Sequence, residues 1–134
     1  MVFLLQGIRF AVDLAKVAEV CDPLQISPIP RAPEFITGVI NFHGDIVATI
    51  DLAHFLGLSG SSRQGKLIVI CQDISPIAFY VDSVVKIISE NEVAFNMPDN
   101  GRLALAKLGF TGGEAVLLDL ETLAKETENC LTNN

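Results

Sequence analysis

The chain has 134 residues, 50% of them hydrophobic, and it carries a formal net charge of −7 with only 9 Lys and Arg residues. This length suits one compact domain with a sizeable core. The scarcity of positive charge argues against binding to nucleic acid or to an anionic membrane surface. No apolar run approaches the roughly 18 residues of a membrane span, and the first residues lack the basic segment of a secretory signal. We therefore expect a cytoplasmic protein.

Short β-type runs dominate the chain, with turn residues between them at close spacing, which favours a small all-β barrel or sandwich with brief helices. The first two runs flank Gln6-Gly7 and predict a hairpin. The stretch from Gly38 to Leu52, GVINFHGDIVATIDL, predicts a strand, a tight turn that contains His43, and a second strand. The clearest predicted strands are, in chain order, residues 2–5, 8–12, 46–50, 66–72, 77–81, 84–88 and 114–118.

The segments between these runs have different compositions. Residues 14–20, LAKVAEV, follow Asp13 and predict one or two helical turns. Residues 22–33 contain four prolines and are expected to run extended, as an edge strand or a loop, because proline cannot donate to a sheet ladder. Residues 59–65 predict a polar turn or short linker. The polar tail from Glu126 onward is expected to fray.

An internal repeat relates the two halves of the chain. The sequence FAVD at Phe10–Asp13 recurs as FYVD at Phe79–Asp82, 69 residues later. Likewise GDIVATIDLAHFL, which starts at Gly44, lines up with GGEAVLLDLETLA, which starts at Gly112, 68 residues later. Two separate blocks share nearly the same offset, which is about half the chain. The repeat predicts two related lobes built from the same order of elements.

Aspartates end several of the repeated blocks. Asp51 and Asp119 each follow a strand and precede a segment with helical periodicity, and Asp13 has a similar place. An aspartate at such a position accepts hydrogen bonds from the free backbone N–H groups of the first helical turn. We expect these carboxylates to be helix caps rather than catalytic groups.

The residues that most often carry chemistry form no familiar motif. Cys21, Cys71 and Cys130 are odd in number, have no paired spacing, and are expected to be reduced thiols. His43 and His54 lie 11 residues apart, which fits no common metal-ligand motif. Phosphate loops and nucleophile elbows are absent. We therefore expect no enzymatic activity, no cofactor and no metal. The alternative from this class is a small thiol or metal enzyme built on Cys21, Cys71, His43 and His54.

Branched apolar residues are more numerous than two small barrels need inside. They are either all core or, collectively, candidates for a groove between the lobes that accepts a helix or loop of a partner. The residues concerned are Val17, Val20, Ile36, Val39 and Val81.

The string GVINFHGDIVATIDLAHFLGL, from Gly38 to Leu58, resembles the central motif of the CheW-like domain found in bacterial chemotaxis coupling proteins, G-V-x-N-L-R-G-x-I-V-P-V-x-D-L. Other blocks are similar to the family in the same order along nearly the whole chain. They are FLLQGIRFAVDLAKVAEV, ISPIPRAPEFITGVIN, IAFYVDSVVKII and LALAKLGFTGGEAVLLDLETL.

The resemblance implies an all-β fold of two small five-stranded β-barrels that share a hydrophobic core, within a single domain over residues 1–134. It also implies a non-enzymatic scaffold that couples the cytoplasmic tip of methyl-accepting chemotaxis receptors to the regulatory domain of the histidine kinase CheA. In the family the receptor tip packs between the barrels and the kinase binds barrel ends. Such a protein is cytoplasmic and is recruited to membrane receptor arrays. By position, the residues expected to contact the receptor or the kinase are Val17, Glu19, Gly38, Asn41, His43 and Gly44.

Two departures from the central motif matter. Ala48 replaces the proline, and His43 replaces an arginine, which would offer five donors in a permanently charged fork. A histidine with its usual pKa near about 6.5 is mostly neutral at pH 7. We therefore expect weaker coupling, with partner affinity rising modestly as the pH falls through about 6.5. The alternative is a divergent adaptor or decoy in another receptor–kinase pathway, such as motility or development.

Overall fold

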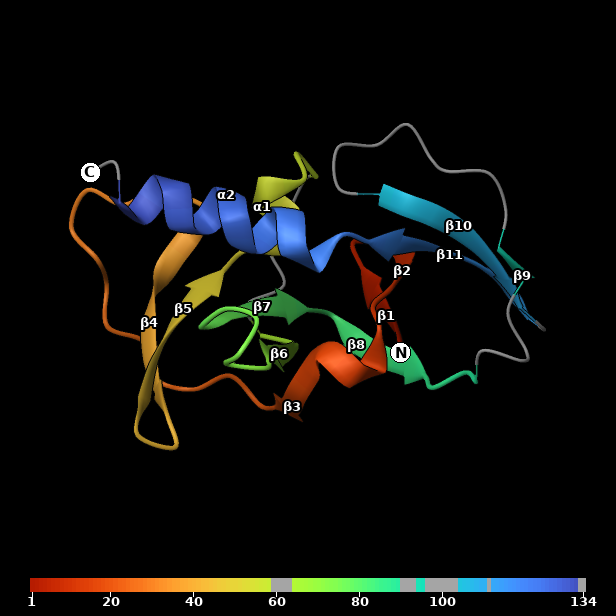
Figure 1. Cartoon of the computed structure of the whole chain (residues 1–134), viewed down its shortest axis with the longest axis horizontal. Coiled ribbons are helices and arrows are strands. Elements are labelled where there is room, and N and C mark those ends of the chain that lie inside the picture. Colours follow the sequence, from red (N-terminus) through yellow and green to blue (C-terminus); the bar gives the residue numbers. More distant parts are fainter. Residues whose placement is uncertain (59–63, 90–93, 96–103, 111, 133–134) are drawn as a thin grey trace.

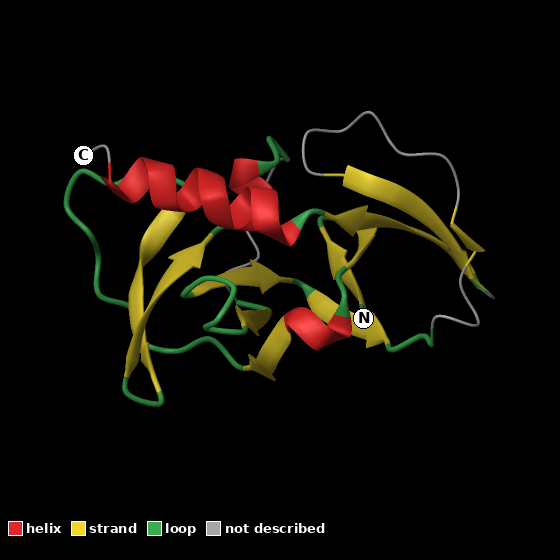
Figure 2. Ribbon diagram, in the orientation of Figure 1, coloured by secondary structure: helices red, strands yellow, loops and turns green. Residues whose placement is uncertain are grey.

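The computed structural model describes the chain except for residues 59–63, 90–93, 96–103, 111 and 133–134. Strands make up most of the ordered elements, as Figure 2 shows. The elements in chain order are β1 (Val2–Leu5), β2 (Ile8–Ala11), a 3₁₀ turn η1 (Leu14–Lys16), β3 (Val17–Cys21), β4 (Ile36–Phe42), β5 (Asp45–Ile50), α1 (Leu52–Phe55), β6 (Lys66–Ile70), β7 (Ile77–Val81), β8 (Ser83–Lys86), β9 (Ala94–Phe95), β10 (Ala104–Phe110), β11 (Gly113–Leu118) and α2 (Leu120–Thr132) (Figure 1).

The described strands form two sheets, with the orders β3-β6-β7-β5-β4 and β8-β1-β2-β11-β10-β9. Each sheet combines antiparallel hairpins with one parallel pair, β5 with β7 and β2 with β11. Each strand of the first half has a counterpart in the second half: β1 and β6, β2 and β7, β3 and β8, β4 and β10, and β5 and β11. Swapping the members of each pair turns the order of the five-stranded sheet into that of the other sheet without its short β9. The repeat in the sequence is therefore also a repeat in sheet topology.

The two halves of the chain exchange their first hairpins. The hairpin β1–β2 lies in the sheet of the second half, and β6–β7 lies in the sheet of the first half (Figure 1). Each sheet is thus built from both halves, and the two halves of the chain cannot separate without breaking strand pairs in each sheet. The repeat predicted related lobes, but only the three-dimensional pairing reveals that they interlock.

The expected closed five-stranded barrels are open, curved sheets in this structure. Among the described strands no ladder joins the outer strands β3 and β4, or β8 and β9. The proline-rich segment between β3 and β4 runs beside the free edge of β4, where Ser27 and Val39 exchange two backbone hydrogen bonds of 2.8 and 2.9 Å. The predicted edge role of this segment is confirmed. Its prolines at positions 28, 30 and 33 prevent the ladder from continuing on the far side of Ser27.

The sheets share one hydrophobic core because their central strands are apolar on both faces. In β6, Ile68 and Ile70 face the core between the sheets, while Leu67 and Val69 face the concave interior of the five-stranded sheet. All four are fully buried. Strands buried on both sides read as continuous apolar runs. This is why KLIVI and IAFYV show no alternation of polar and apolar residues.

Helix α2 covers one end of the shared core (Figure 1). Its buried residues are Leu120, Leu123, Ala124 and Thr127. The expectation that the tail frays from Glu126 is wrong, because the helix continues to Thr132 and the buried Ser75 hydroxyl donates to Glu128 at 3.1 Å. Within the described ranges, no helix is long and apolar enough to span a membrane.

The predicted aspartate caps are confirmed. A carboxylate oxygen of Asp51 accepts from the His54 backbone N–H at 3.3 Å, and Asp119 accepts from the Thr122 backbone N–H at 3.1 Å. Asp13 accepts from Ala15 at 3.0 Å, but it caps only the single turn η1. The helical prediction for residues 14–20 therefore holds for one turn, after which the chain pairs with β6 as strand β3.

Gly38 lies where two backbone segments meet. It pairs with Thr49 directly after a register shift in the β4–β5 ladder between Ile36 and Gly38, and it has a φ of 155°. A Cβ at this position would collide with the Ser27 carbonyl oxygen and lie 2.9 Å from the Ser27 carbonyl carbon. Glycine is therefore required for the proline-rich segment to reach β4.

Substitution Asp119→Ala is expected to lower the free energy of unfolding by about 1 kcal/mol at neutral pH, the usual cost of a lost helix cap. The Thr122 hydroxyl hydrogen bond lowers the pKa of the Asp119 carboxyl, and this outweighs desolvation, which raises it. The carboxylate therefore stabilises the fold above its unfolded pKa of about 3.9, and this contribution is lost as the pH falls through the lower folded value. Urea denaturation from pH 7 to 3 measures the difference. Asp119→Asn, which keeps an acceptor oxygen, is the control, and equal stability of all three proteins would contradict the cap.

Substitution Gly38→Ala is expected to destabilise the fold by about 1–3 kcal/mol, the usual cost of overpacking, because the new methyl group meets backbone atoms that cannot move aside. Gly44→Asn is the control, since a Cβ added at Gly44 would have no neighbour within 4 Å and asparagine tolerates a positive φ. Chemical denaturation of both variants measures the change in the free energy of unfolding. If Gly38→Ala proves as stable as the native chain, the close approach is not needed.

Candidate functional site

The end of the β4–β5 hairpin presents three of the predicted contact residues, Asn41, His43 and Gly44. Phe42 and Asp45 pair at its end, so His43 and Gly44 form a two-residue turn. Both have positive φ, 51° and 91°, as a type I′ turn requires. The Asn41 side-chain oxygen accepts from the Gly44 backbone N–H at 2.9 Å and holds the turn. Histidine is one of the residue types that tolerate this conformation.

The side chain of His43 lies between the hairpin and β3. Its ring centroid is 4.4 Å from that of Phe42, and its Nε2 atom is 3.6 Å from Oε1 of Glu19. Strands β3 and β4 are the two outermost strands of the five-stranded sheet. The sheet therefore curves enough to bring its opposite edges within reach of one side-chain pair. His43 and Glu19 keep 73% and 45% of their side-chain surface exposed.

The other two predicted contact residues have structural surroundings. Val17 pairs with Ile70 and packs, partly buried, against the shared core. Gly38 is buried beneath the proline-rich segment. The structure thus brings Glu19, Asn41, His43 and Gly44 together on an accessible surface, whereas Val17 is partly buried and Gly38 is buried.

The residues proposed from sequence to line an apolar groove are likewise partly exposed and partly buried. Ile36 and Val81 are buried in the core, so they line no accessible groove. Val20 is exposed on β3. Sequence reasoning missed Leu24 and Ile46, which are 40% and 64% exposed. Ile46 belongs to an apolar run that looked fully buried, and nothing in that run indicates that its first isoleucine lies beyond the edge of the core.

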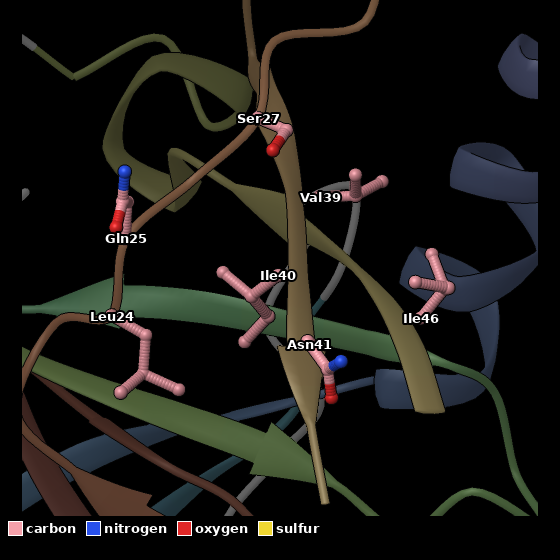
Figure 3. Close-up of a pocket in the computed structure, with 7 residues that line it drawn as sticks. All are labelled: Leu24, Gln25, Ser27, Val39, Ile40, Asn41 and Ile46. Atoms are coloured by element: carbon pink, nitrogen blue, oxygen red, sulfur yellow. The ribbon is translucent and has the colours of Figure 1, made fainter. Parts of the chain in front are cut away.

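A hollow of about 420 Å³ lies between the segment that leaves β3 and the free edge of β4 (Figure 3). It is open to solvent and contains no ionisable side chain. Its lining mixes four apolar side chains with three that carry an amide or hydroxyl group: Leu24, Gln25, Ser27, Val39, Ile40, Asn41 and Ile46. Such a lining suits burial of an apolar side chain from a partner better than catalysis.

Among the described residues, those considered for a thiol or metal enzyme do not form one site. Burial raises the pKa of the Cys21 thiol, and the nearby carboxylates of Glu19 and Asp22 raise it further, against the opposing effect of Lys66. A thiol held in its protonated form is a poor nucleophile. His54 lies 3.6 Å from Glu34, away from His43. In the described part of the chain no three His, Cys, Asp or Glu residues gather in a way that could hold a metal ion.

Comparison with known proteins gives a consistent result. Residues 1–128 match the family described as "CheW-like domain". The chain is 29% identical to the chemotaxis protein CheW of Thermotoga maritima over 90% of this chain and 82% of that protein. It is also 29% identical to the chemotaxis protein CheW of Klebsiella aerogenes over 100% of this chain and 86% of that protein.

The fold is similar to the crystal structure of the scaffolding protein TtCheW from Thermoanaerobacter tengcongensis, with a TM-score of 0.78 and 27% sequence identity. The match covers 91% of this chain and 88% of that structure. The expected mostly-β fold of two sheets around a shared core is confirmed by this similarity and by the strand pairing. The chain belongs to the CheW-like domain family.

Proposed function

We propose that this chain is a non-enzymatic scaffold that couples chemoreceptors to the histidine kinase CheA in bacterial chemotaxis signalling. The family match over residues 1–128 carries the proposal, because it includes almost every element of the fold. Its partners are the cytoplasmic tip of a methyl-accepting chemotaxis receptor and the regulatory domain of the kinase. The whole chain acts as one domain in the cytoplasm, at membrane receptor arrays.

The most suitable contact region is the tip of the five-stranded sheet. This tip surface consists of Glu19 and Val20 on β3, Leu24 after it, and Asn41, His43 and Ile46 on the β4–β5 hairpin. Three of these residues are exposed apolar side chains, at 38%, 40% and 64% of their surface. An apolar centre with a polar rim is the usual anatomy of a protein–protein contact. Because the family's kinase binds barrel ends, we assign the tip surface to the kinase.

The chemistry of the tip surface favours recognition over reaction. Its ionisable groups, Glu19 and His43, contact each other rather than converge on a cavity where a substrate could sit. The adjacent hollow is lined by groups that neither gain nor lose protons near neutral pH. A general acid or base must reach its substrate, and no such pair is aimed at this hollow.

A second candidate keeps the fold and changes the output. The chain is then a divergent adaptor or a decoy that occupies receptors without full activation of the kinase, in a pathway such as motility or development. The observation that favours it is His43, since the family's central motif has arginine there. Histidine offers fewer donors and is charged for only part of the physiological pH range.

The native chain is expected to bind both the receptor tip and the kinase regulatory domain in a pull-down. A folded chain that binds neither of them would refute the proposed function.

Substitution Ile46→Asp should weaken kinase binding about tenfold or more, because it places a charge in the apolar centre of the tip surface. Fold stability should change little, since Ile46 is 64% exposed.

The matched control is Ile87→Asp, which makes the same change at a 63% exposed isoleucine that follows β8 in the other sheet. Titration calorimetry with the kinase domain should distinguish the two variants, and receptor binding should be retained by Ile46→Asp. Equal losses for both variants would place the kinase contact elsewhere.

Substitution His43→Arg is expected to raise kinase stimulation in reconstituted receptor arrays at pH 7.5, because arginine supplies a permanent charge and more hydrogen-bond donors. The measurement is ATP-dependent phosphorylation of the kinase with receptors present. His43→Asn is the control, since asparagine accepts the positive φ of the turn without adding charge. If the native chain already stimulates the kinase as strongly as His43→Arg, the decoy candidate is wrong.

A further inference from the structure

Each sheet has a side-chain contact between two strands that do not pair, and the two contacts differ in chemistry. In the six-stranded sheet, Lys86 at the end of edge strand β8 places its ammonium group 5.3 Å from the ring centre of Phe110 at the end of β10, the strand next to edge strand β9. In the five-stranded sheet the equivalent strands are the two edges, β3 and β4, and the contact is between Glu19 and His43, 3.6 Å apart. The lysine is charged throughout the physiological range, whereas the histidine forms an ion pair only when it is protonated.

The Glu19–His43 contact crosses a gap that no strand pairing closes in the described part of the chain. The sheet order places three strands between β3 and β4. The segment after β3 meets β4 at Ser27 and Val39, and the hollow lies before this contact, between Leu24 and Gln25 of the segment and the β4–β5 hairpin. The side-chain pair therefore lies at the open end of the curved sheet, where it can add a direct connection between the two edges.

Histidine protonation is the main change in charge at this tip between pH 8 and 5.5. His43 contacts Glu19 on β3, and Asp45 at the start of β5 follows it by two residues. Near the end of β3, Glu19, Asp22 and Lys66 act on the pKa of the Cys21 thiol. Carboxylates stay ionised and lysines stay protonated over this range. Lys66 is paired with Asp22 at 2.5 Å, and burial raises the pKa of the Cys21 thiol, so it also stays protonated.

We propose that His43 and Glu19 form a proton-dependent clasp that joins the two open edges of the five-stranded sheet. At pH 8 the neutral imidazole makes a weak contact with Glu19. On protonation the imidazolium pairs with the carboxylate, and β3 is connected to the β4–β5 turn by opposite charges.

The clasp bears on partner binding through the hairpin that it holds. Asn41 accepts from the backbone of Gly44 in the turn and also lines the hollow, so the turn and the hollow share one side chain. The protonated clasp gives His43 the positive charge that arginine supplies in the family's central motif. The second part of the inference, which rests on the proposed function, is that the kinase regulatory domain binds this chain more tightly at lower pH.

The test of the clasp itself needs no partner. The folding equilibrium constant is measured by urea denaturation for the native chain, His43→Asn, Glu19→Gln and the double variant, at pH 5.5 and pH 8. At pH 5.5 each single substitution should reduce the constant roughly two- to fivefold, the range of exposed ion pairs, and the double variant should lose little more. At pH 8 the interaction between the two substitutions should vanish.

The four proteins form a double-mutant cycle, in which the contributions of other groups that titrate between pH 5.5 and 8 cancel. His54 beside Glu34 is present in all four proteins, as is the N-terminal amino group, whose pKa is lowered by burial. His43→Arg provides a further control, because its interaction with Glu19 should persist at pH 8. An interaction that is equal at both pH values, or absent at both, would overturn the clasp. Asparagine accepts the backbone of the turn, so loss of folding is not expected to obscure the result.

The expected pH dependence of kinase binding is tested by titrating the chain with the kinase regulatory domain at pH values from 8 to 5.5. The native chain should gain roughly two- to fivefold in affinity, in line with the strength of one exposed charge pair. His43→Asn and His43→Arg should both give flat profiles. No binding at any pH would count against the proposed function and leave the denaturation cycle to decide the clasp. Binding that is strong and flat for the native chain would refute the regulatory role alone.

Discussion

The packing of the two exchanged hairpins against each other is the constraint on which the rest of the structure depends. Phe3 of β1 stacks on Phe10 of β2 and meets Phe79 of β7, with ring centroids 5.9 and 5.7 Å apart. Phe3 and Phe79 are completely buried. Burial of a phenylalanine side chain contributes about 1.5–3 kcal/mol, and this contact joins one sheet to the other. It also joins the first half of the chain to the second, because each hairpin lies in the sheet of the opposite half.

The exchange explains how a small chain can present a defined surface at the end of an open sheet. Strands β6 and β7 are buried on both faces, so the middle of the five-stranded sheet cannot shift without disturbing the shared core. Its edges are less constrained. Strand β4 is held by its ladder with β5, by the bridge between Ser27 and Val39, and by the Asp51 backbone N–H, which donates to the Phe35 carbonyl oxygen just before β4 at 2.7 Å. The tip surface therefore combines a rigid base with groups that remain accessible.

Charge and apolar surface are combined at this tip in a way suited to reversible contact. Exposed Leu24 and Ile46 provide apolar area, and Glu19, His43 and the Lys66–Asp22 pair provide polar surroundings. Exposed charge pairs contribute little to affinity by themselves, but they influence which partner fits and in which orientation. A scaffold needs contacts of this kind, since it must hold partners together without consuming or altering them.

The sequence by itself determined the elements and most of their local chemistry. Positive-φ turns at Gln6-Gly7 and His43-Gly44, the caps at Asp51 and Asp119, and the apolar runs of β6 and β7 depend on neighbouring residues, so each could be predicted from a few letters. The repeat and the central motif likewise pointed to the family. The proposed contact residues Asn41, His43 and Gly44 followed from that motif and Glu19 from an earlier block that resembles the family, while Leu24 and Ile46 followed from neither.

Only the tertiary structure decided which strands pair across the chain and what each exposed residue meets. The exchange of hairpins joins residues far apart in the sequence, such as Phe10 and Val116, and local pattern carries no information about such pairings. Periodicity also fails for a strand buried on both faces, which is why the sequence left the burial of Val81 open and gave no sign that Ile46 is exposed. The approach of His43 to Glu19 depends on the curvature of a whole sheet, a property that arises only when five strands from both halves of the chain twist together.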